Sequence, residues 1–298
     1  MKALYSLLIL FTILVEAETH LIVLGSGTPN PDPERSGSAY AVIVDEDVYL
    51  VDFGYGIVRS ASVLSTEYGG EFNQLNAKNL KIAFLTHIHS DHSGGLADLV
   101  LTPWIMGREE PLELYGPQGL KNMSKHLLAA YKLDIDYRIN GSQPSNPEGF
   151  KINAHEITEG LIYMDKNVRV EAFVNNHGDL NNSYGFVFKT KDKKIVFSGD
   201  TAPSINLNKF AQGAQILVHE VYSSEGFLTK TDDWQIYHQA HHTSSKEIGL
   251  IADKLDIDTL VLSHILYWGS NDLSIIKDVK ESFNGNIVVA SDSLVISQ

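Results

Sequence analysis

Five short apolar runs of this chain each end in a histidine or a carboxylate, and this pattern restricts the folds open to it. The residues that close these runs are Asp52, His87, Asp200, the pair His219 and Glu220, and His264. Short runs of aliphatic and β-branched residues are typical of buried strands. Side chains at strand ends project from a rigid scaffold into the loops beyond it, where functional residues concentrate. The pattern therefore predicts a sheet-based fold with a polar site at the ends of its strands.

Helical patterns separate several of these strand-like runs. They cover residues 94–106, 118–131, 205–212 and 244–255. The last of them opens with Ser244 or Ser245 as the expected N-cap. Strands interleaved with helices predict a mixed α/β fold of layered sheets with outer helices. The segment 140–149, rich in proline, serine and glycine, is predicted to be a surface loop and the only plausible seam between domains. We expect residues 18–298 to form one domain.

The first 17 residues have the features of a secretory signal peptide. Lys2 precedes an unbroken apolar stretch from Ala3 to Val15, and Val15 and Ala17 stand at the spacing that a signal peptidase accepts. A buried first strand and a membrane anchor are the alternatives, but the stretch is shorter than the roughly 20 residues that a spanning helix needs. We predict cleavage after Ala17, no membrane span in the mature chain, and a periplasmic or secreted location.

Composition excludes several kinds of site. The chain has no cysteine, which rules out disulfides, thiolate nucleophiles and cysteine-ligated metals, so any metal must bind to imidazole and carboxylate. The 43% apolar fraction is that of a folded protein. The formal net charge of −14 disfavours a broad surface for a phosphate backbone.

The densest group of metal-competent side chains lies in the segment Thr86–His92, whose sequence is THIHSDH. In an extended chain the alternate residues His87 and His89 point the same way. Asp91 and His92 follow in the turn before a helix and are aimed at the same space. Three imidazoles and a carboxylate brought together without a ligand would cost desolvation and repulsion on protonation. The segment therefore predicts a metal site, with zinc as the expected ion and manganese or iron as alternatives.

The segment resembles the H-x-H-x-D-H signature of the metallo-β-lactamase superfamily, and the resemblance extends over the whole mature chain. It implies an αββα sandwich with two metal ions. By this resemblance, the first ion is bound by His87, His89 and His177, the second by Asp91, His92 and His264, and Asp200 bridges both. Asp91 would also accept the proton of the attacking water. Asp52 matches a supporting aspartate that orients ligands without binding metal.

Two further elements resemble the phosphodiesterase branch of this superfamily, which contains ribonuclease Z and a group of exported arylsulfatases. The sequence HEVY from His219 is similar to an H-E-A-T element, and HHT from His241 is similar to an H-S-T loop. The resemblance implies that His241 donates a proton to the leaving oxygen and that Glu220 orients it. His242 is the rival for this role, and a purely polar loop of His238, His241 and His242 is the alternative.

The chain departs from ribonuclease Z because only six residues separate the runs 184–188 and 195–200, which leaves no room for the tRNA-binding arm. The four lysines between residues 189 and 194 indicate a solvated hairpin. Other motifs are most similar to the arylsulfatase-type group. Aromatic residues near the site motifs could form an apolar wall against an aryl leaving group, and these are Trp104, Trp234, Tyr237, Tyr267 and Trp268.

We therefore expect an exported dinuclear zinc hydrolase that cleaves a small sulfate or phosphate ester by attack of metal-bound hydroxide. Its expected partner is a small anionic ester and not a nucleic acid, and a homodimer is compatible with the sequence. A tRNA 3′-processing endoribonuclease is the first alternative. A lactonase or β-lactamase, and a non-catalytic metal-binding relative, are the further ones.

Overall fold

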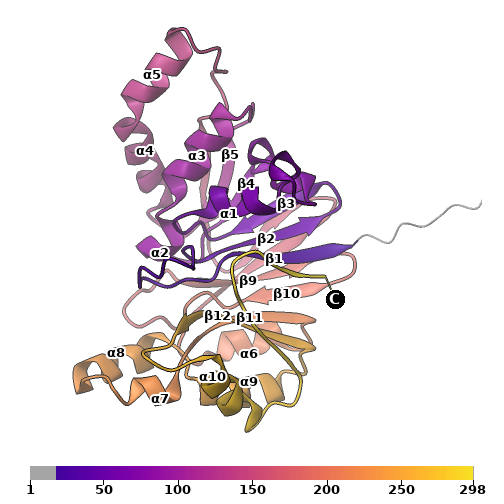
Figure 1. The fold of residues 1–298 in the computed structure, drawn as a ribbon, viewed down its shortest axis with the longest axis vertical. Coiled ribbons are helices and arrows are strands. Elements are labelled where there is room, and N and C mark those ends of the chain that lie inside the picture. Colours follow the sequence, from indigo (N-terminus) through magenta and orange to yellow (C-terminus); the bar gives the residue numbers. More distant parts are fainter. Residues whose placement is uncertain (1–17, 298) are drawn as a thin grey trace, which may run out of the picture.

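The computed structural model describes residues 18–297, and the expected αββα sandwich is confirmed (Figure 1). The strands of the first sheet are β1 (Thr19–Gly25), β2 (Ala39–Val44), β3 (Asp47–Val51), β4 (Ile82–Phe84), β5 (Leu112–Gly116), β6 (Ile152–Glu156) and β14 (Leu294–Ile296). Those of the second are β7 (Gly160–Met164), β8 (Arg169–Val174), β9 (Tyr184–Lys189), β10 (Lys194–Phe197), β11 (Ile216–Tyr222), β12 (Thr259–Leu266) and β13 (Asn286–Val289). Their orders are β14-β1-β2-β3-β4-β5-β6 and β13-β12-β11-β10-β9-β8-β7.

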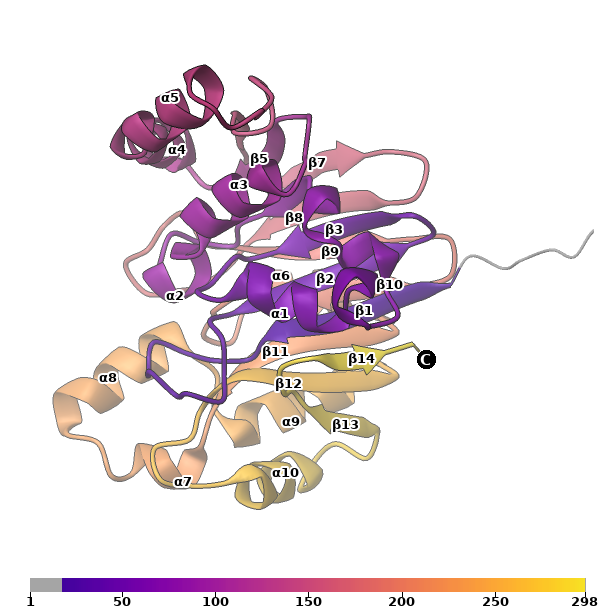
Figure 2. The ribbon, with the colours of Figure 1, turned by 45° about the horizontal axis from the view of Figure 1, so that its top comes forward.

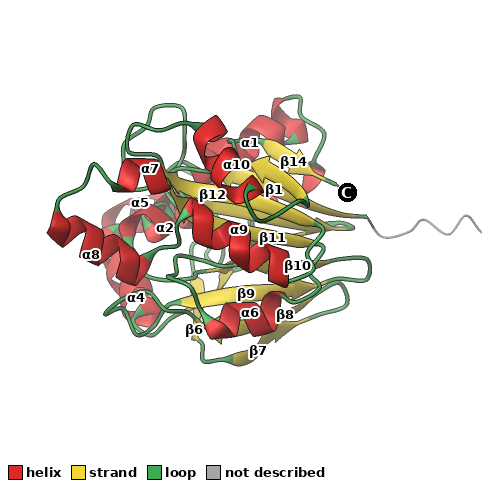
Figure 3. Ribbon diagram, turned by 90° about the horizontal axis from the view of Figure 1, so that it is seen from below, coloured by secondary structure: helices red, strands yellow, loops and turns green. Residues whose placement is uncertain are grey.

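Helices lie outside the two sheets. Those of the first half are α1 (Ile57–Leu64), α2 (Ser90–Ser93), α3 (Leu96–Ile105), α4 (Leu120–Ala130) and α5 (Lys132–Asn140). Those of the second half are α6 (Ile205–Ala211), α7 (Ser224–Phe227), α8 (Asp232–His241), α9 (Ser245–Lys254) and α10 (Asp272–Lys280). Helices α6 and α9 cross the outer face of the second sheet (Figure 3). The four helices that the sequence predicts are confirmed as α3, α4, α6 and α9.

The alternation of side chains along the central strands builds the layers. In β2 every residue is buried, because Ala41 and Ile43 face the helices of the first half while Val42 and Val44 face the second sheet. The second sheet is equally two-sided, since Val218 packs between the sheets and Leu217 packs under its own helices. Two sheets buried on both faces explain why the apolar runs are continuous instead of alternating.

Strand direction brings the ends of several strands together. Strands β3 to β6 run parallel to one another, and so do β10 to β13. Their carboxyl ends lie at the end of the sandwich that also carries α2, α7 and α8 (Figures 1 and 2). The loops that leave these strands are therefore placed to form one site.

Residues 141–149 lack regular structure, as predicted, but they are packed onto the first half of the fold. The buried guanidinium of Arg108 donates hydrogen bonds to the carbonyl oxygens of Leu80, Leu99, Val100 and Gly149. This shared set of acceptors joins the loop to α3 and to the segment before β4. The loop is therefore part of a single domain and not a seam.

The N-cap of α9 is Ser244, one of the two residues that the sequence offered. Its hydroxyl accepts a hydrogen bond from the backbone of Glu247, and the Glu247 side chain accepts one from the Ser244 backbone, which is a complete capping box. Ser244→Ala is expected to lower the free energy of unfolding by about 1 kcal/mol, measured by urea denaturation. Glu247→Gln keeps an acceptor and should cost less; an equal loss for both variants would contradict the capping account.

The predicted signal peptide lies outside the described residues. Within residues 18–297 the structure has no helix long and apolar enough to cross a membrane.

Candidate metal centre

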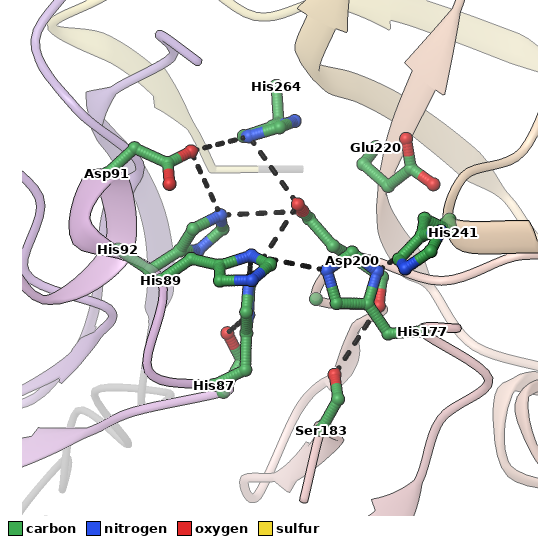
Figure 4. A network of polar contacts seen from close by, with 12 residues as sticks. His87, His89, Asp91, His92, His177, Ser183, Asp200, Glu220, His241 and His264 are labelled. Atoms are coloured by element: carbon green, nitrogen blue, oxygen red, sulfur yellow. Dashed lines mark hydrogen bonds and ion pairs between the residues drawn. The ribbon is translucent and has the colours of Figure 1, made fainter. Parts of the chain in front are cut away.

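Seven histidine and aspartate side chains meet where the carboxyl ends of the parallel strands come together (Figure 4). They are His87, His89, Asp91, His92, His177, Asp200 and His264. All except His89 are buried. The first sheet and its helix α2 supply four of them, and the second sheet supplies the other three. The structure thus brings together every residue that the resemblance assigned to metal.

The first group consists of three imidazoles, from His87, His89 and His177. Nδ1 of His89 lies 3.1 Å from Nε2 of His87 and 3.3 Å from Nε2 of His177. Burial lowers the pKa of His87 well below its usual range. A neutral imidazole is the form that binds metal, so three such nitrogens around one point suit a cation.

The second group consists of Asp91, His92 and His264. Oδ2 of Asp91 lies 3.0 Å from Nε2 of His264 and 3.5 Å from Nε2 of His92. Asp200 lies between the two groups. Its carboxylate oxygens are 3.5 Å from Nε2 of His92 and 3.6 Å from Nε2 of His264. The same carboxylate is 3.9 Å from Nε2 of His87, so it faces members of both groups, as a bridging ligand must.

Two buried atoms at the centre of this cluster have no hydrogen-bond partner. They are Nε2 of His92 and Oδ1 of Asp200, which face each other at 3.5 Å. A buried polar atom left unpaired costs about 1–3 kcal/mol, and a divalent cation would satisfy both. Imidazole nitrogens and carboxylate oxygens without thiolate suit zinc and other divalent ions of the first transition row. The donor set therefore fits divalent metal ions.

Asp52 lies behind the ligands, as the sequence led us to expect. Its carboxylate accepts hydrogen bonds from the backbone nitrogen of Thr86 at 2.8 Å and from the Thr86 hydroxyl. Nδ1 of His92 lies 2.7 Å from its other oxygen. A carboxylate on Nδ1 fixes the tautomer and leaves Nε2 free to bind metal. Asp52 has a left-handed backbone with φ of 56°, and this uncommon conformation for a non-glycine residue accompanies the functional position.

Backbone from the end of α8 orients His177 in the same manner. Nδ1 of His177 donates to the carbonyl oxygen of His241 at 2.8 Å, which leaves Nε2 aimed at the first group. The neighbouring residue must be Gly178, because its φ is 56° and a Cβ there would stand 1.9 Å from Nε2 of His241. The sequence gives no sign of this backbone support.

The contacts of Glu220 bear on the choice between His241 and His242. Oε2 of Glu220 lies 3.4 Å from Nδ1 of His242, and neither atom has a hydrogen-bond partner. In contrast, Nδ1 of His241 donates to the carbonyl oxygen of Tyr237 at 2.7 Å, and its ring stacks on that tyrosine. The chain leaves α8 at His242 in an extended conformation, which points the two rings differently. Of the two rings, the one beside the Glu220 carboxylate is therefore that of His242.

The Glu220–His242 pair touches the metal cluster. A ligand nitrogen of His242 lies within 4.8 Å of ligand atoms of His177 and Asp200. Burial, reinforced by the charge of Asp200, raises the pKa of Glu220 well above its usual range. Burial also lowers the pKa of His242 to about 4. Burial thus favours the neutral form of both groups.

Two of the five aromatic residues proposed as a wall lie elsewhere. Trp104 is 1% exposed within the core under the first sheet, and its Nε1 donates to the carbonyl oxygen of Asn146. Tyr267 lines a separate cavity. Trp234, Tyr237 and Trp268 do line the cavity of about 350 Å³ that contains His89, Asp91, Asp200 and His264. The prediction for Trp104 rested on its closeness in sequence to the metal motif. It was wrong because helix α3, which carries Trp104, turns that side chain away from the site.

A β-sandwich with helices on both outer faces and a shared histidine and aspartate centre at its strand ends defines a metallohydrolase. Residues 32–264 match the model of the metallo-β-lactamase superfamily. The chain belongs to that superfamily.

The chain is similar to named relatives in sequence and to solved structures in fold. It is 29% identical over 249 residues to ribonuclease Z of Mycobacterium bovis, covering 82% of this chain and 85% of the relative. The structure is similar to human tRNase Z, short form, with a TM-score of 0.65, 23% identity and coverage of 93% and 98%. It is also similar to the metallo-β-lactamase fold protein YhfI from Bacillus subtilis, with a TM-score of 0.71, 18% identity and coverage of 94% and 99%.

Metal removal is expected to destabilise the protein. Ions that bind only the folded state add roughly 4 kcal/mol each at a thousandfold excess over Kd, so chelation should lower Tm by roughly 10 °C or more. Differential scanning calorimetry with and without chelator measures this change, and added zinc should reverse it. An unchanged Tm after verified metal loss would contradict a structural contribution of the centre.

Proposed function

We propose that this protein is a two-zinc phosphodiesterase that hydrolyses RNA in the manner of a ribonuclease Z. The observation that carries the proposal is the Glu220–His242 pair beside the metal cluster. Hydrolysis of RNA expels a ribose alkoxide, which is a poor leaving group and needs a proton. A nitrophenolate, or a β-lactam nitrogen under metal catalysis, depends less on protonation. The ribonuclease Z relatives support the same choice. Manganese and iron are the alternative metals.

The proposed roles follow from the contacts. His87, His89 and His177 would bind one ion, Asp91, His92 and His264 would bind the other, and Asp200 would bridge them. Two divalent ions held in this way would supply an activated water at neutral pH and stabilise charge on the substrate oxygens.

Proton transfer is the part that the side chains themselves perform. Asp91 accepts the proton of the attacking water. Nε2 of His242 donates a proton to the leaving oxygen while Nδ1 takes the proton of Glu220. Asp91 gains one proton and Glu220 loses one, so the charge of the protein is unchanged by the step. The starting state returns when Asp91 releases its proton to solvent, Nδ1 of His242 returns its proton to Glu220, and Nε2 of His242 takes up a new one.

The test is cleavage of RNA by metal-loaded protein. A precursor tRNA with a 3′ trailer and an unstructured RNA of the same length are incubated with the protein, and products are separated on a denaturing gel. Cleavage that chelator stops and zinc restores is the expected result. Hydrolysis of bis(p-nitrophenyl) phosphate with both RNAs left intact would overturn the proposal.

A small aryl sulfate or phosphate ester is the second candidate substrate. The aromatic side chains that line the cavity, Trp234, Tyr237 and Trp268, favour it. The net charge of −14 and the predicted export signal are further support, and periplasmic or secreted location is part of this proposal. Turnover of nitrophenyl sulfate with no cleavage of RNA would make it the better assignment.

A further inference from the structure

The cavity at the metal centre extends past the ligands to the segment between α7 and α8. Its further lining residues include Lys230, Trp234, His238 and Trp268. None of them belongs to the metal groups or to the Glu220–His242 pair. Lys230 is the only lysine or arginine among the described residues that line the cavity. In a chain of net charge −14, this single cation is the feature of the cavity most suited to a second anionic group of a substrate.

Three rings form a continuous surface here, which we call the aromatic wall: Trp234, His238 and Trp268. His238 is stacked on Trp234 with centroids 5.5 Å apart, and it lies 4.3 Å from Trp268. His238 is 8% exposed and its Nδ1 has no hydrogen-bond partner. Trp234, in contrast, is 54% exposed although it lines a cavity. An exposed ring next to a buried, unpaired polar ring is suited to a planar, hydrogen-bonding group.

Trp268 is held in place by its surroundings. Its backbone is left-handed, with φ of 48°, an uncommon conformation for a bulky residue. Gly226 of α7 packs so closely that a Cβ there would stand 3.0 Å from Cβ of Trp268. The ammonium group of Lys230 lies 4.7 Å from the centre of the Trp268 ring. The ring and the cation are therefore positioned together.

A second cavity of about 230 Å³ borders the first at Trp268 and Asn30. Arg35 lines this second cavity together with Asp32, and the two side chains form an ion pair at 3.8 Å. An extended substrate that crosses Trp268 would reach this second cavity. A small aryl ester would fill only the first cavity.

We propose that this region is a subsite for a single-stranded nucleic acid: a nucleotide next to the cleaved bond stacks on the aromatic wall, and its phosphate pairs with Lys230. The inference rests on the proposed phosphodiesterase function and specifies the substrate as an unpaired strand. It also reconciles an RNA substrate with the acidic surface, because a short unpaired segment needs one or two cations and not a broad basic face.

The kinetic test compares substrates that differ in length. Lys230→Gln and Trp268→Ala are each expected to lower kcat/KM for a uridine hexanucleotide by about 5- to 100-fold. Lys230→Gln should leave kcat/KM for bis(p-nitrophenyl) phosphate within about threefold of the parent, because that ester has no neighbouring phosphate. Lys209→Gln is the matched control, since Lys209 also lies over an aromatic ring, that of Phe210, but on α6.

Salt dependence separates a phosphate contact from a packing role. For Lys230→Gln, the negative slope of log kcat/KM for the hexanucleotide against log salt concentration should become less negative by about 0.7 relative to the parent. A merely structural lysine would lower the rate without changing this slope. Trp268→Phe should recover most of the activity lost in Trp268→Ala, since a smaller ring still stacks.

Binding gives a readout independent of turnover. The chain has three tryptophans, and Trp104 is in the core, so fluorescence changes on binding arise at Trp234 and Trp268. A phosphorothioate-linked uridine hexanucleotide, which is cleaved slowly, should quench the fluorescence of the metal-loaded protein. The quenching should be largely lost in a variant with Trp234→Phe and Trp268→Phe.

The outcomes distinguish a failure of the subsite from a failure of the proposed phosphodiesterase function. Cleavage of the hexanucleotide together with equal effects of Lys230→Gln on both substrates, or unchanged quenching, would overturn the subsite and leave the phosphodiesterase function standing. No cleavage of any RNA by the parent protein would overturn the function itself.

Discussion

Asp200→Ala is expected to lower kcat/KM by at least about 10³-fold for every substrate, and to reduce the metal content to one ion per chain or fewer. The Asp200 carboxylate lies within 4 Å of ring nitrogens of His87, His92 and His264, so it faces both groups. Metal-assisted stabilisation of the transition state amounts to several kcal/mol, which corresponds to a loss of this size. Steady-state kinetics and plasma emission measurements of metal content test the two parts separately.

The control for Asp200→Ala is Asp253→Ala, an exposed aspartate on α9. It should retain both metal and activity. An Asp200→Ala protein that is folded, carries two ions and keeps the parent's activity would refute the bridging role.

His242→Ala is expected to lower the rate of RNA cleavage by about 10²- to 10⁴-fold, the usual contribution of a positioned general acid. The rate on bis(p-nitrophenyl) phosphate should fall by less than about tenfold, because nitrophenolate leaves without protonation. The reason lies in the geometry: Nδ1 of His242 faces the Glu220 carboxyl at 3.4 Å, and the ring borders the metal cluster. Measuring both substrates with one protein preparation removes differences in metal loading.

The matched variant is His241→Ala, which removes the neighbouring ring but keeps the backbone carbonyl that orients His177. Its effect on RNA cleavage should be much smaller than that of His242→Ala. Equal losses on good and poor leaving groups would remove His242 from the acid role. A larger loss for His241→Ala than for His242→Ala would return that role to His241.

Local patterns predicted the central part of the fold because their physical cause is local. His87, His89, Asp91 and His92 lie within six residues, so their convergence needs only a strand end and one turn. The inner strands were equally clear, since burial on both faces makes them continuously apolar. Edge strands are different: β6 is INAHE, with three of its five residues exposed, and it gives no comparable signal.

Tertiary packing decided what the sequence left open. His241 and His242 are adjacent and chemically identical, and only the end of α8 determines which ring meets Glu220. Trp104 follows the ligand His92 closely in the sequence, whereas Trp234 is farther from every aspartate of the centre. Trp104 nevertheless lies in the core, and Trp234 lines the cavity. The role of α8 was not foreseen, since most residues of its sequence, DDWQIYHQAH, are polar.

Each of the two ligand groups draws residues from both halves of the chain, and this division sets the order in which the protein can mature. A growing chain cannot complete the first group before His177 has been made, and it cannot complete the second before His264 has been made. Both groups therefore require a chain that extends at least to His264. A shorter chain would lack a side chain of the second group, so two ions could be bound only after both sheets have been synthesised up to β12.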